Sequence, residues 1–236
     1  MSLAANLSIL WRGGAPKEPQ PEDTSLVKEL VGLCNAGQVP DVSLYEQRFA
    51  VLDTETTGLR PDAGDKIISL GCVEVIKAKI GNNRFGTLVD PGREVPALAT
   101  SITGIGSEDV QGQPLIEEII PPMLKYIVGG VVTGFNIQFD LVFVNNTLRR
   151  EFGVSLAPVP LLDVLSICRA LKPNARNYSL EMMAAQYRIP VQGRHTAMGD
   201  ALMTARLLLN LLPELEERGV RTLRDLGQFL RYQALY

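Results

Sequence analysis

Apolar residues in the first half of the chain follow the spacing of β-strands. Residues 49–52 form a short apolar run, Phe-Ala-Val-Leu, which predicts a buried strand. The stretches 66–80 and 83–91 carry partly alternating apolar residues and predict two more strands. The sequence Gly81-Asn82-Asn83 between them predicts a hairpin turn. These three strands are therefore expected to form a meander.

In the second half of the chain, predicted strands alternate with predicted helices. Residues 130–136 predict another buried strand, and residues 160–171 begin as a strand and continue as a helix. Alternation of this kind, after a meander, predicts an α/β domain with a mixed sheet. Apolar residues at helical spacing predict further helices over 24–36, 115–128, 138–151, 179–189, 199–212 and 222–235.

Composition along the chain divides it into three parts. Residues 1–47 are rich in proline and glycine near their start and are expected to form an N-terminal arm with a short helix. Residues 48–212 hold the α/β pattern and are expected to form one domain. Residues 213–236 are expected to form a C-terminal helical segment.

Bulk composition excludes several classes of protein. A net charge of −3 argues against bulk attraction to nucleic acid, so nucleic-acid binding would need a local basic surface. Three widely spaced cysteines favour buried thiols in a reducing compartment. The chain has neither an apolar run of about 18 residues nor a signal-peptide pattern. We therefore expect a cytoplasmic protein with no membrane partner.

Two carboxylates directly follow the first buried strand. Asp53 and Glu55 lie two positions apart, so on an extended strand both side chains point to the same face. Like charges at this spacing are unfavourable unless a proton or a cation neutralises them. In open α/β sheets, ligands bind beyond the carboxyl ends of the strands, which is where both acids are expected.

Two further acids and one histidine extend this set. Asp140 and Asp200 are each expected in the first turn of a helix, where either could simply stabilise the helix end. His195 is the only histidine, and it lies five residues before Asp200 in a polar, glycine-containing loop. Four converging carboxylates would need a divalent metal, and oxygen ligands suit Mg²⁺ or Mn²⁺.

Three segments of the chain resemble the motifs of one known family. The segments DTETTG (53–58), GFNIQFD (134–140) and HTAMGD (195–200) resemble the motifs of the DEDDh 3'-to-5' exonucleases. This ribonuclease-H-like family includes the proofreading epsilon subunit of bacterial DNA polymerase III. The resemblance covers residues 47–212 and implies a ribonuclease-H-like mixed five-stranded sheet with helices on both faces.

The resemblance also implies an activity. It implies metal-dependent hydrolysis of phosphodiester bonds from the 3' end of single-stranded nucleic acid, with DNA proofreading or repair as the setting and nucleoside 5'-monophosphates as products. His195 would act as the general base on the attacking water, a role that suits imidazole near neutral pH. Two Mg²⁺ or Mn²⁺ ions would be held by the four acids, with Asp53 bridging both: Asp53, Glu55, Asp140 and Asp200.

The same resemblance implies substrate contacts and a partner. Thr103 and Phe135 stand where the family usually has histidine, and these replacements bear on substrate preference more than on activity. A DNA polymerase is the partner that the epsilon subunit implies. Core packing explains Phe139 equally well as substrate contact. The residues expected near the terminal nucleotide are Thr56, Thr57, Asn136, Phe139 and Arg194.

Two other functions stay open from the sequence alone. An exoribonuclease that trims short RNA would carry the same motifs, because the 2'-hydroxyl is recognised by local contacts. A non-catalytic nucleotide-binding adaptor could also use this fold, since fold does not settle function. The complete set of four acids and His195 argues against the adaptor, for which at least one ligand should be lost.

Overall fold

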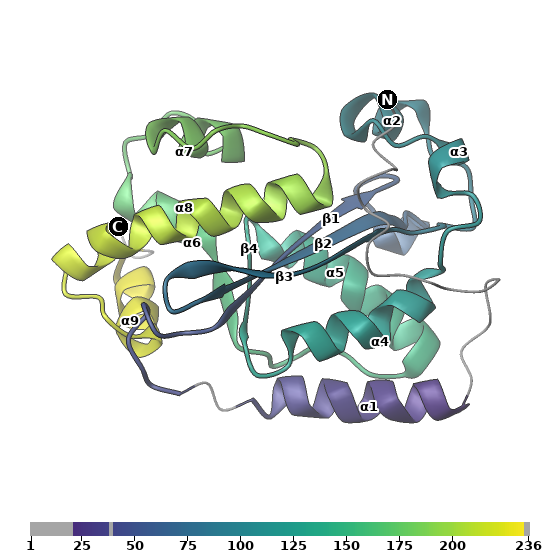
Figure 1. Cartoon of the computed structure of the whole chain (residues 1–236), viewed down its shortest axis with the longest axis horizontal. Coiled ribbons are helices and arrows are strands. Elements are labelled where there is room, and N and C mark those ends of the chain that lie inside the picture. Colours follow the sequence, from purple (N-terminus) through teal and green to yellow (C-terminus); the bar gives the residue numbers. More distant parts are fainter. Residues whose placement is uncertain (1–20, 38–39, 234–236) are drawn as a thin grey trace.

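Residues 21–37 and 40–233 are described by a computed structural model, in which helices cover both faces of a mixed sheet (Figure 1). The elements are, in chain order, α1 (Pro21–Asn35), β1 (Phe49–Thr56), η2 (Pro61–Ala63), β2 (Ile67–Ile76), β3 (Lys79–Leu88), α2 (Ala97–Thr103), α3 (Ser107–Val110), α4 (Ile116–Ile127), β4 (Val131–Gly134), α5 (Ile137–Thr147), the π-helical turn η3 (Leu148–Phe152), β5 (Leu161–Asp163), α6 (Val164–Leu171), α7 (Leu180–Gln186), α8 (Ala197–Glu217) and α9 (Leu223–Gln233).

The five strands lie in the order β3-β2-β1-β4-β5. Strand β1 is central and pairs antiparallel with β2 and parallel with β4. The outer pairs are antiparallel for β2 with β3 and parallel for β4 with β5. This arrangement confirms the predicted α/β fold, with a meander followed by strands that alternate with helices.

The hairpin turn between β2 and β3 lies at Lys77 and Ala78, so its prediction at residues 81–83 is wrong. The strand register pairs Ile76 with Lys79, which leaves only two residues in the turn. Both have positive φ, 51° and 52°, as a two-residue turn that matches the strand twist requires. Residues 81–83 lie inside β3, where pairing with β2 outweighs their preference for turns.

The predicted helices are all present, although several ends differ. Helix α8 extends to Glu217 and crosses the domain boundary that the sequence suggests after residue 212. Helix α1 begins at Pro21, earlier than predicted, and proline is well tolerated in a first helical turn. The first 20 residues of the arm predicted over residues 1–47 lie outside the described residues.

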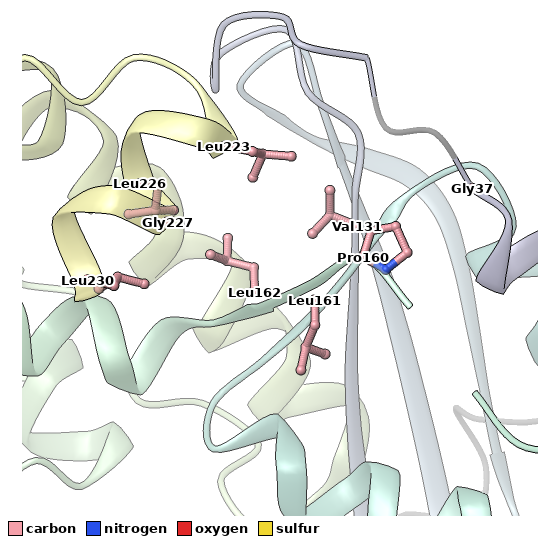
Figure 2. Close-up of a pocket in the computed structure, with 9 residues that line it drawn as sticks. All are labelled: Gly37, Val131, Pro160, Leu161, Leu162, Leu223, Leu226, Gly227 and Leu230. Carbon is pink, nitrogen blue, oxygen red and sulfur yellow. The ribbon is translucent and has the colours of Figure 1, made fainter. Parts of the chain in front are cut away.

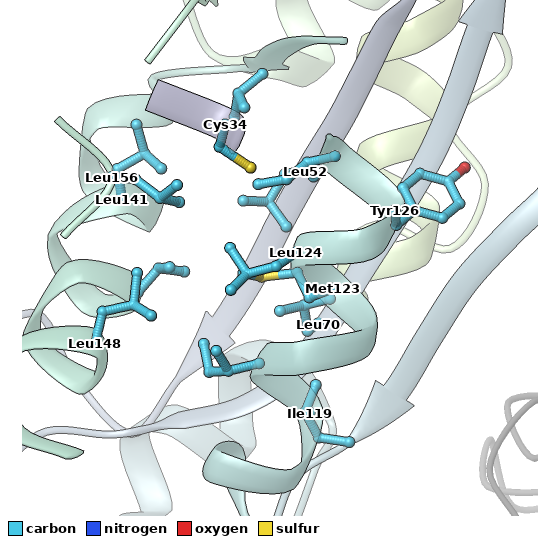
Figure 3. Close-up of a cluster of buried hydrophobic side chains, with 14 of the residues drawn as sticks. Cys34, Leu52, Leu70, Ile119, Met123, Leu124, Tyr126, Leu141, Leu148 and Leu156 are labelled. Carbon is cyan, nitrogen blue, oxygen red and sulfur yellow. The ribbon is translucent and has the colours of Figure 1, made fainter. Parts of the chain in front are cut away.

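Strand β1 contributes side chains to a hydrophobic cluster on each face of the sheet. Ala50 and Leu52 pack with α1, α4 and α5 in the first cluster (Figure 3). Phe49 and Val51 pack with α6, α7, α8 and α9 in the second. Because strand side chains alternate, this burial on both faces fixes the register of β1 and therefore the direction of the side chains that follow.

Helix α1 packs on the core, although the sequence places it in an N-terminal arm. Val27, Leu30, Val31 and Cys34 are buried in the first cluster, beside α4. Asn35 Nδ2 also donates a hydrogen bond of 2.9 Å to the Ser155 carbonyl oxygen. The helix therefore covers one face of the same sheet that carries the site. The division of the chain at residue 47 stays a prediction.

The cysteine thiols agree with the prediction of buried side chains in place of disulfides. Cys34, Cys72 and Cys168 are free and buried. Burial raises the pKa of the Cys34 thiol to about 11, which keeps that thiol protonated near neutral pH. Among the described residues, the helices are too short or too polar to cross a membrane.

Candidate active site

The carboxyl end of β1 lies between α5 on one face of the sheet and α8 on the other. Thr54 points to the same face of the sheet as Leu52, and it contacts Asp140 of α5. Asp53 and Glu55 point to the same face as Val51, and they lie beside Asp200 of α8. The strand therefore presents carboxylates to α8 and a hydroxyl group to α5.

A tightly folded loop sets the start of α8. Thr196 is the N-cap, since its Oγ1 accepts a hydrogen bond of 3.1 Å from the Gly199 N–H. A Cβ atom on Gly199 would lie 1.9 Å from the Gly193 carbonyl oxygen, so the loop can pack there only against a glycine. This packing places Asp200 in the first turn of α8 and His195 directly before the cap.

A second close approach brings α8 against the sheet. Gly71 in β2 pairs with Asp53 in the strand register. A Cβ atom on Gly71 would lie 2.5 Å from the Ala197 carbonyl carbon, so the start of α8 rests directly on the backbone of β2. The absence of a side chain at Gly71 therefore allows Asp200 to reach the end of β1.

Asp140 is held from the strand side. Its Oδ1 accepts hydrogen bonds from the Thr54 N–H at 2.8 Å and from Thr54 Oγ1 at 2.7 Å. In the turn before α5, Asn136 has a left-handed backbone conformation, with a φ of 62°. Its N–H donates a hydrogen bond of 2.8 Å to Asp163 Oδ1. Asp163 thus holds the turn before α5. Sequence reasoning did not single out Thr54, although strand alternation places it opposite the two acids.

Three carboxylates converge at this point. Asp53, Glu55 and Asp200 each offer an oxygen atom, and these atoms lie within 4.8 Å of one another. Asp140 lies close enough that its charge raises the pKa of Asp53. Asp140 and Asp200 are 4% and 3% exposed, so little solvent reaches either carboxylate. The structure therefore gathers all four acids around the end of β1.

The acids raise one another's pKa values. Burial and the neighbouring acids raise the pKa of Asp53 well above its usual range. Burial and the Asp200 charge raise the pKa of Glu55 to about 7. Burial also raises the pKa of Asp140 to about 7, although hydrogen bonds from Thr54 oppose this rise. Without a cation, the cluster therefore retains protons near neutral pH.

Arg194 links the cluster to α7. Its Nη1 donates to Asp200 Oδ2, and its Nε donates to Glu181 Oε1 at 2.6 Å. Burial raises the pKa of Asp200, and the Arg194 charge opposes that rise. Sequence reasoning missed Glu181, because its contact with Arg194 depends on how the loop after α7 folds back, which leaves no signal in residue spacing. The predicted contact of Arg194 with substrate stays a prediction.

His195 lies at the solvent edge of the acidic cluster. Its backbone adopts a positive φ of 60°, and its side chain is 41% exposed. Its Nε2 lies 4.0 Å from Glu181 Oε1. The imidazole therefore lies near Glu181, which Arg194 links to Asp200, and a water molecule or a substrate could reach it.

The two threonines after Glu55 shape the turn that follows β1. Thr57 is buried, and its Oγ1 donates to Asp65 Oδ1 at 3.2 Å and accepts from the Lys66 N–H at 3.0 Å. Thr56 Oγ1 donates to the Gly58 carbonyl oxygen at 2.6 Å. Both hydroxyl groups therefore hold the turn, and their predicted contacts with a nucleotide stay predictions.

Asn136 and Phe139 lie at the start of α5, on the same side of β1 as Asp140. Asn136 is exposed, and its side chain does not cap the helix. Phe139 is half-buried, packs on the first hydrophobic cluster, and lies 5.1 Å from the Phe143 ring, measured between centroids. The contact with Phe143 gives Phe139 a packing role, and its contact with substrate stays a prediction.

The two positions where the family usually has histidine serve local structure here. Thr103 ends α2, and its Oγ1 donates to the Ala99 carbonyl oxygen at 3.0 Å and accepts from the Ile105 N–H at 3.1 Å. Phe135 packs on the second hydrophobic cluster. Neither side chain therefore offers the polar group that a histidine would supply.

A separate apolar pocket lies away from the acids. Helix α9 forms this pocket with the first residues of β4 and β5 (Figure 2). Its volume is about 340 Å³. Val131 and Leu161 line it at the amino ends of their strands, whereas the acids lie beyond the carboxyl end of β1. The pocket is therefore distinct from the acidic site.

The residues at the acidic site fit a divalent cation. Asp200 Oδ1 is buried and accepts no hydrogen bond from the described residues. A buried acceptor without a partner is costly, and a cation would satisfy it. The donor set consists of carboxylate oxygens, which suit hard cations such as Mg²⁺ and Mn²⁺.

Comparison with known proteins identifies the family. Residues 50–208 match the family model described as Exonuclease, so the chain belongs to the exonuclease family. A DNA polymerase III subunit epsilon from Aquifex aeolicus is 32% identical over 173 residues, which cover 73% of this chain and 84% of that protein. These matches confirm the resemblance that the three motifs carry.

Two further similarities define the extent of the match. A DNA polymerase III subunit epsilon-like protein from Rhodobacter capsulatus is 34% identical over 198 residues, which cover 82% of this chain and 28% of that protein. The structure of exonuclease X in complex with 5' overhanging duplex DNA has a TM-score of 0.59 at 26% identity and covers 78% of this chain and 99% of that chain. The chain thus spans under a third of the Rhodobacter protein.

Proposed function

We propose that this protein is a metal-dependent 3'-to-5' exonuclease that releases nucleoside 5'-monophosphates from single-stranded ends. The observation that carries this proposal is the convergence of Asp53, Glu55 and Asp200, with Asp140 beside them. Membership of the exonuclease family supports the same reaction. A packed core alone gives no reason to gather four acids whose charges oppose one another.

The acids would hold two divalent cations, Mg²⁺ or Mn²⁺. Asp53, Glu55 and Asp200 would hold one cation, and Asp140 would help Asp53 to hold the second. Bound cations would supply charge neutralisation at the phosphate and would favour ionisation of the attacking water. The raised pKa values of Asp53 and Glu55 agree with such a site. Burial and the neighbouring acids raise them, and the positive charge of Arg194 offsets this rise only in part.

His195 would accept a proton from the attacking water. Its exposed imidazole lies directly before the α8 cap, on a loop that the Thr196 cap and the Gly193–Gly199 contact hold in place. A positioned general base typically contributes about 10²–10⁴-fold to a rate.

The terminal nucleotide would lie over the ends of β1 and α5. The residues proposed to contact it are Thr56, Thr57, Asn136, Phe139 and Arg194. Backbone groups of the threonines remain suited to this role even though both hydroxyl groups hold the turn. The bases would stack and the phosphates would approach the cations, which requires an unpaired 3' end.

We propose DNA as the substrate and a DNA polymerase as the partner. The Aquifex relative is named as a polymerase subunit, and the exonuclease X structure contains DNA. The lack of histidine at Thr103 and Phe135 leaves the reaction intact, because neither position belongs to the acidic cluster. RNA is the competing substrate, which the experiment below compares directly.

Digestion of single strands labelled at the 5' end tests this proposal. With Mg²⁺ or Mn²⁺, we expect DNA to shorten one nucleotide at a time from the 3' end, with RNA cut more slowly. EDTA and Asp53→Asn should each abolish the products. A blocked 3' terminus serves as the substrate control. Internal cuts, or equal activity of Asp53→Asn, would rule the proposal out, and faster RNA digestion would reassign the substrate.

A further inference from the structure

Two charged side chains outside the four acids connect α7 to the metal-ligand candidate in α8. Arg194 donates from Nη1 to Asp200 Oδ2 and from Nε to Glu181 Oε1, the latter at 2.6 Å. Glu181 lies in the first turn of α7, outside the three motifs. A guanidinium group is planar and binds carboxylates in a fixed geometry, so Arg194 restrains both acids.

The two oxygens of Asp200 have different surroundings. Oδ2 accepts a hydrogen bond from Arg194, whereas the buried Oδ1 accepts no hydrogen bond from the described residues. One carboxylate oxygen from each of Asp53, Glu55 and Asp200 lies within 4.8 Å of the other two. With Oδ2 held, the direction of Oδ1 is also fixed, because both oxygens belong to one rigid group.

We propose that Arg194 and Glu181 are positioning residues for the metal site and hold Asp200 so that Oδ1 is presented to the cation. This inference rests on the proposed function, since it requires the acids to bind a divalent cation. Carboxylates that bind metals are commonly held by a further hydrogen-bonding partner, and loss of that partner typically weakens metal binding by about 10–100-fold.

The charge of Arg194 acts in the opposite direction. A guanidinium group beside a cation site repels the cation, so its removal would by itself strengthen metal binding. Glu181 offsets this repulsion, because its carboxylate forms an ion pair with the same guanidinium. The pair carries no net charge, and we therefore expect the loss of positioning to outweigh the loss of repulsion.

Calorimetric titration of the chelator-treated full chain with Mn²⁺ tests this inference. Relative to wild type, Arg194→Met should weaken Mn²⁺ binding by about 10–100-fold. Arg194→Lys keeps the charge but lacks the planar fork, so it should restore only part of the affinity. Arg206→Met is the matched control. It also removes one positive charge, but Arg206 lies in α8 about 9 Å beyond Asp200 along the helix axis. Its affinity should equal that of wild type.

A second variant covers the case in which Arg194→Met fails to fold, as judged by circular dichroism. Glu181→Ala removes the other end of the link and should also weaken Mn²⁺ binding. Unchanged or tighter binding in the folded variants would overturn the inference, and tighter binding would show that Arg194 competes with the cation. If wild type itself binds no Mn²⁺, the proposed function fails and this inference fails with it.

Discussion

Asp53 has three acidic neighbours, and the metal-free site strongly disfavours the charged form of its side chain. Burial first, and then the charges of Asp140, Asp200 and Glu55, raise its pKa. Glu55 reaches a pKa of about 7 for similar reasons. In the folded metal-free protein, these acids therefore bind protons that the unfolded chain has already lost. The free energy of unfolding must then fall as pH rises between the ordinary carboxyl pKa of about 4 and neutral pH.

Replacement of Glu55 by glutamine should reveal this penalty. In EDTA, we expect Glu55→Gln to melt above wild type at pH 8, by roughly 2–4 °C for each kcal/mol gained. The difference should shrink as pH falls through about 7 and vanish near pH 4, because wild-type Glu55 is then protonated in both states. Thermal melting across this pH range is the measurement. A difference that grows towards acid pH would contradict the raised pKa.

His195 offers a second test on a single side chain. His195→Ala should lower turnover by about 10²–10⁴-fold at saturating metal, because the water would lose its proton acceptor. Mn²⁺ affinity should stay close to that of wild type, since the imidazole is not one of the three converging ligands. Single-turnover digestion and metal titration separate the two effects. Unchanged turnover would remove His195 from the mechanism.

The start of α8 shows how an element delivers these residues. The N-cap at Thr196, the contact of Gly199 with Gly193 and the contact of Gly71 with Ala197 all act at its first turn. They bring α8 onto β2 beside Asp53. Small residues are therefore required here by the close approach of two backbones, and the catalytic geometry depends on that approach.

Gly199→Ala tests the role of this packing. The added Cβ would meet the Gly193 carbonyl oxygen at 1.9 Å, so the loop that carries His195 must shift. We expect a loss of about 1–3 kcal/mol in the free energy of unfolding and a large loss of turnover. Gly32→Ala is the control, because a Cβ there has no neighbour within 4 Å among the described residues. Wild-type turnover in folded Gly199→Ala would contradict the account.

Short-range patterns predicted the elements and the places of the four acids well. An apolar run that ends in Asp53, and helices that begin near Asp140 and Asp200, are visible within about ten residues of sequence. The turn at Lys77–Ala78 could not be found this way, because pairing with β2 decides the register. The link from Glu181 to Arg194 likewise depends on how α7 packs beside α8.

At the scale of the whole molecule, the packing of α1 depends on contacts that the sequence does not show. Its apolar residues meet α4, which lies about eighty residues further along the chain, and such a contact has no local signature. Composition suggested an arm, whereas Val27 and Leu30 are buried in the first cluster. Burial of an aliphatic side chain contributes about 1.5–3 kcal/mol, so α1 is expected to stabilise the catalytic fold.

Two leucines on α1 allow a matched test of this contribution. Leu30 is 7% exposed and Leu33 is 50% exposed. Leu30→Ala should lower the free energy of unfolding by about 2–4 kcal/mol, whereas Leu33→Ala should change it little. Denaturant unfolding of both variants measures the difference. Equal stability of the two variants would show that α1 does not pack on the sheet as described.

The central claim is that side chains from β1, α5 and α8 form one cation site. A crystal of the protein grown with Mn²⁺ tests it most directly, through the anomalous scattering of that ion. We predict a peak bounded by carboxylate oxygens of Asp53, Glu55 and Asp200, with Asp140 beside it. A map with full Mn²⁺ occupancy elsewhere and none at these carboxylates would contradict the account.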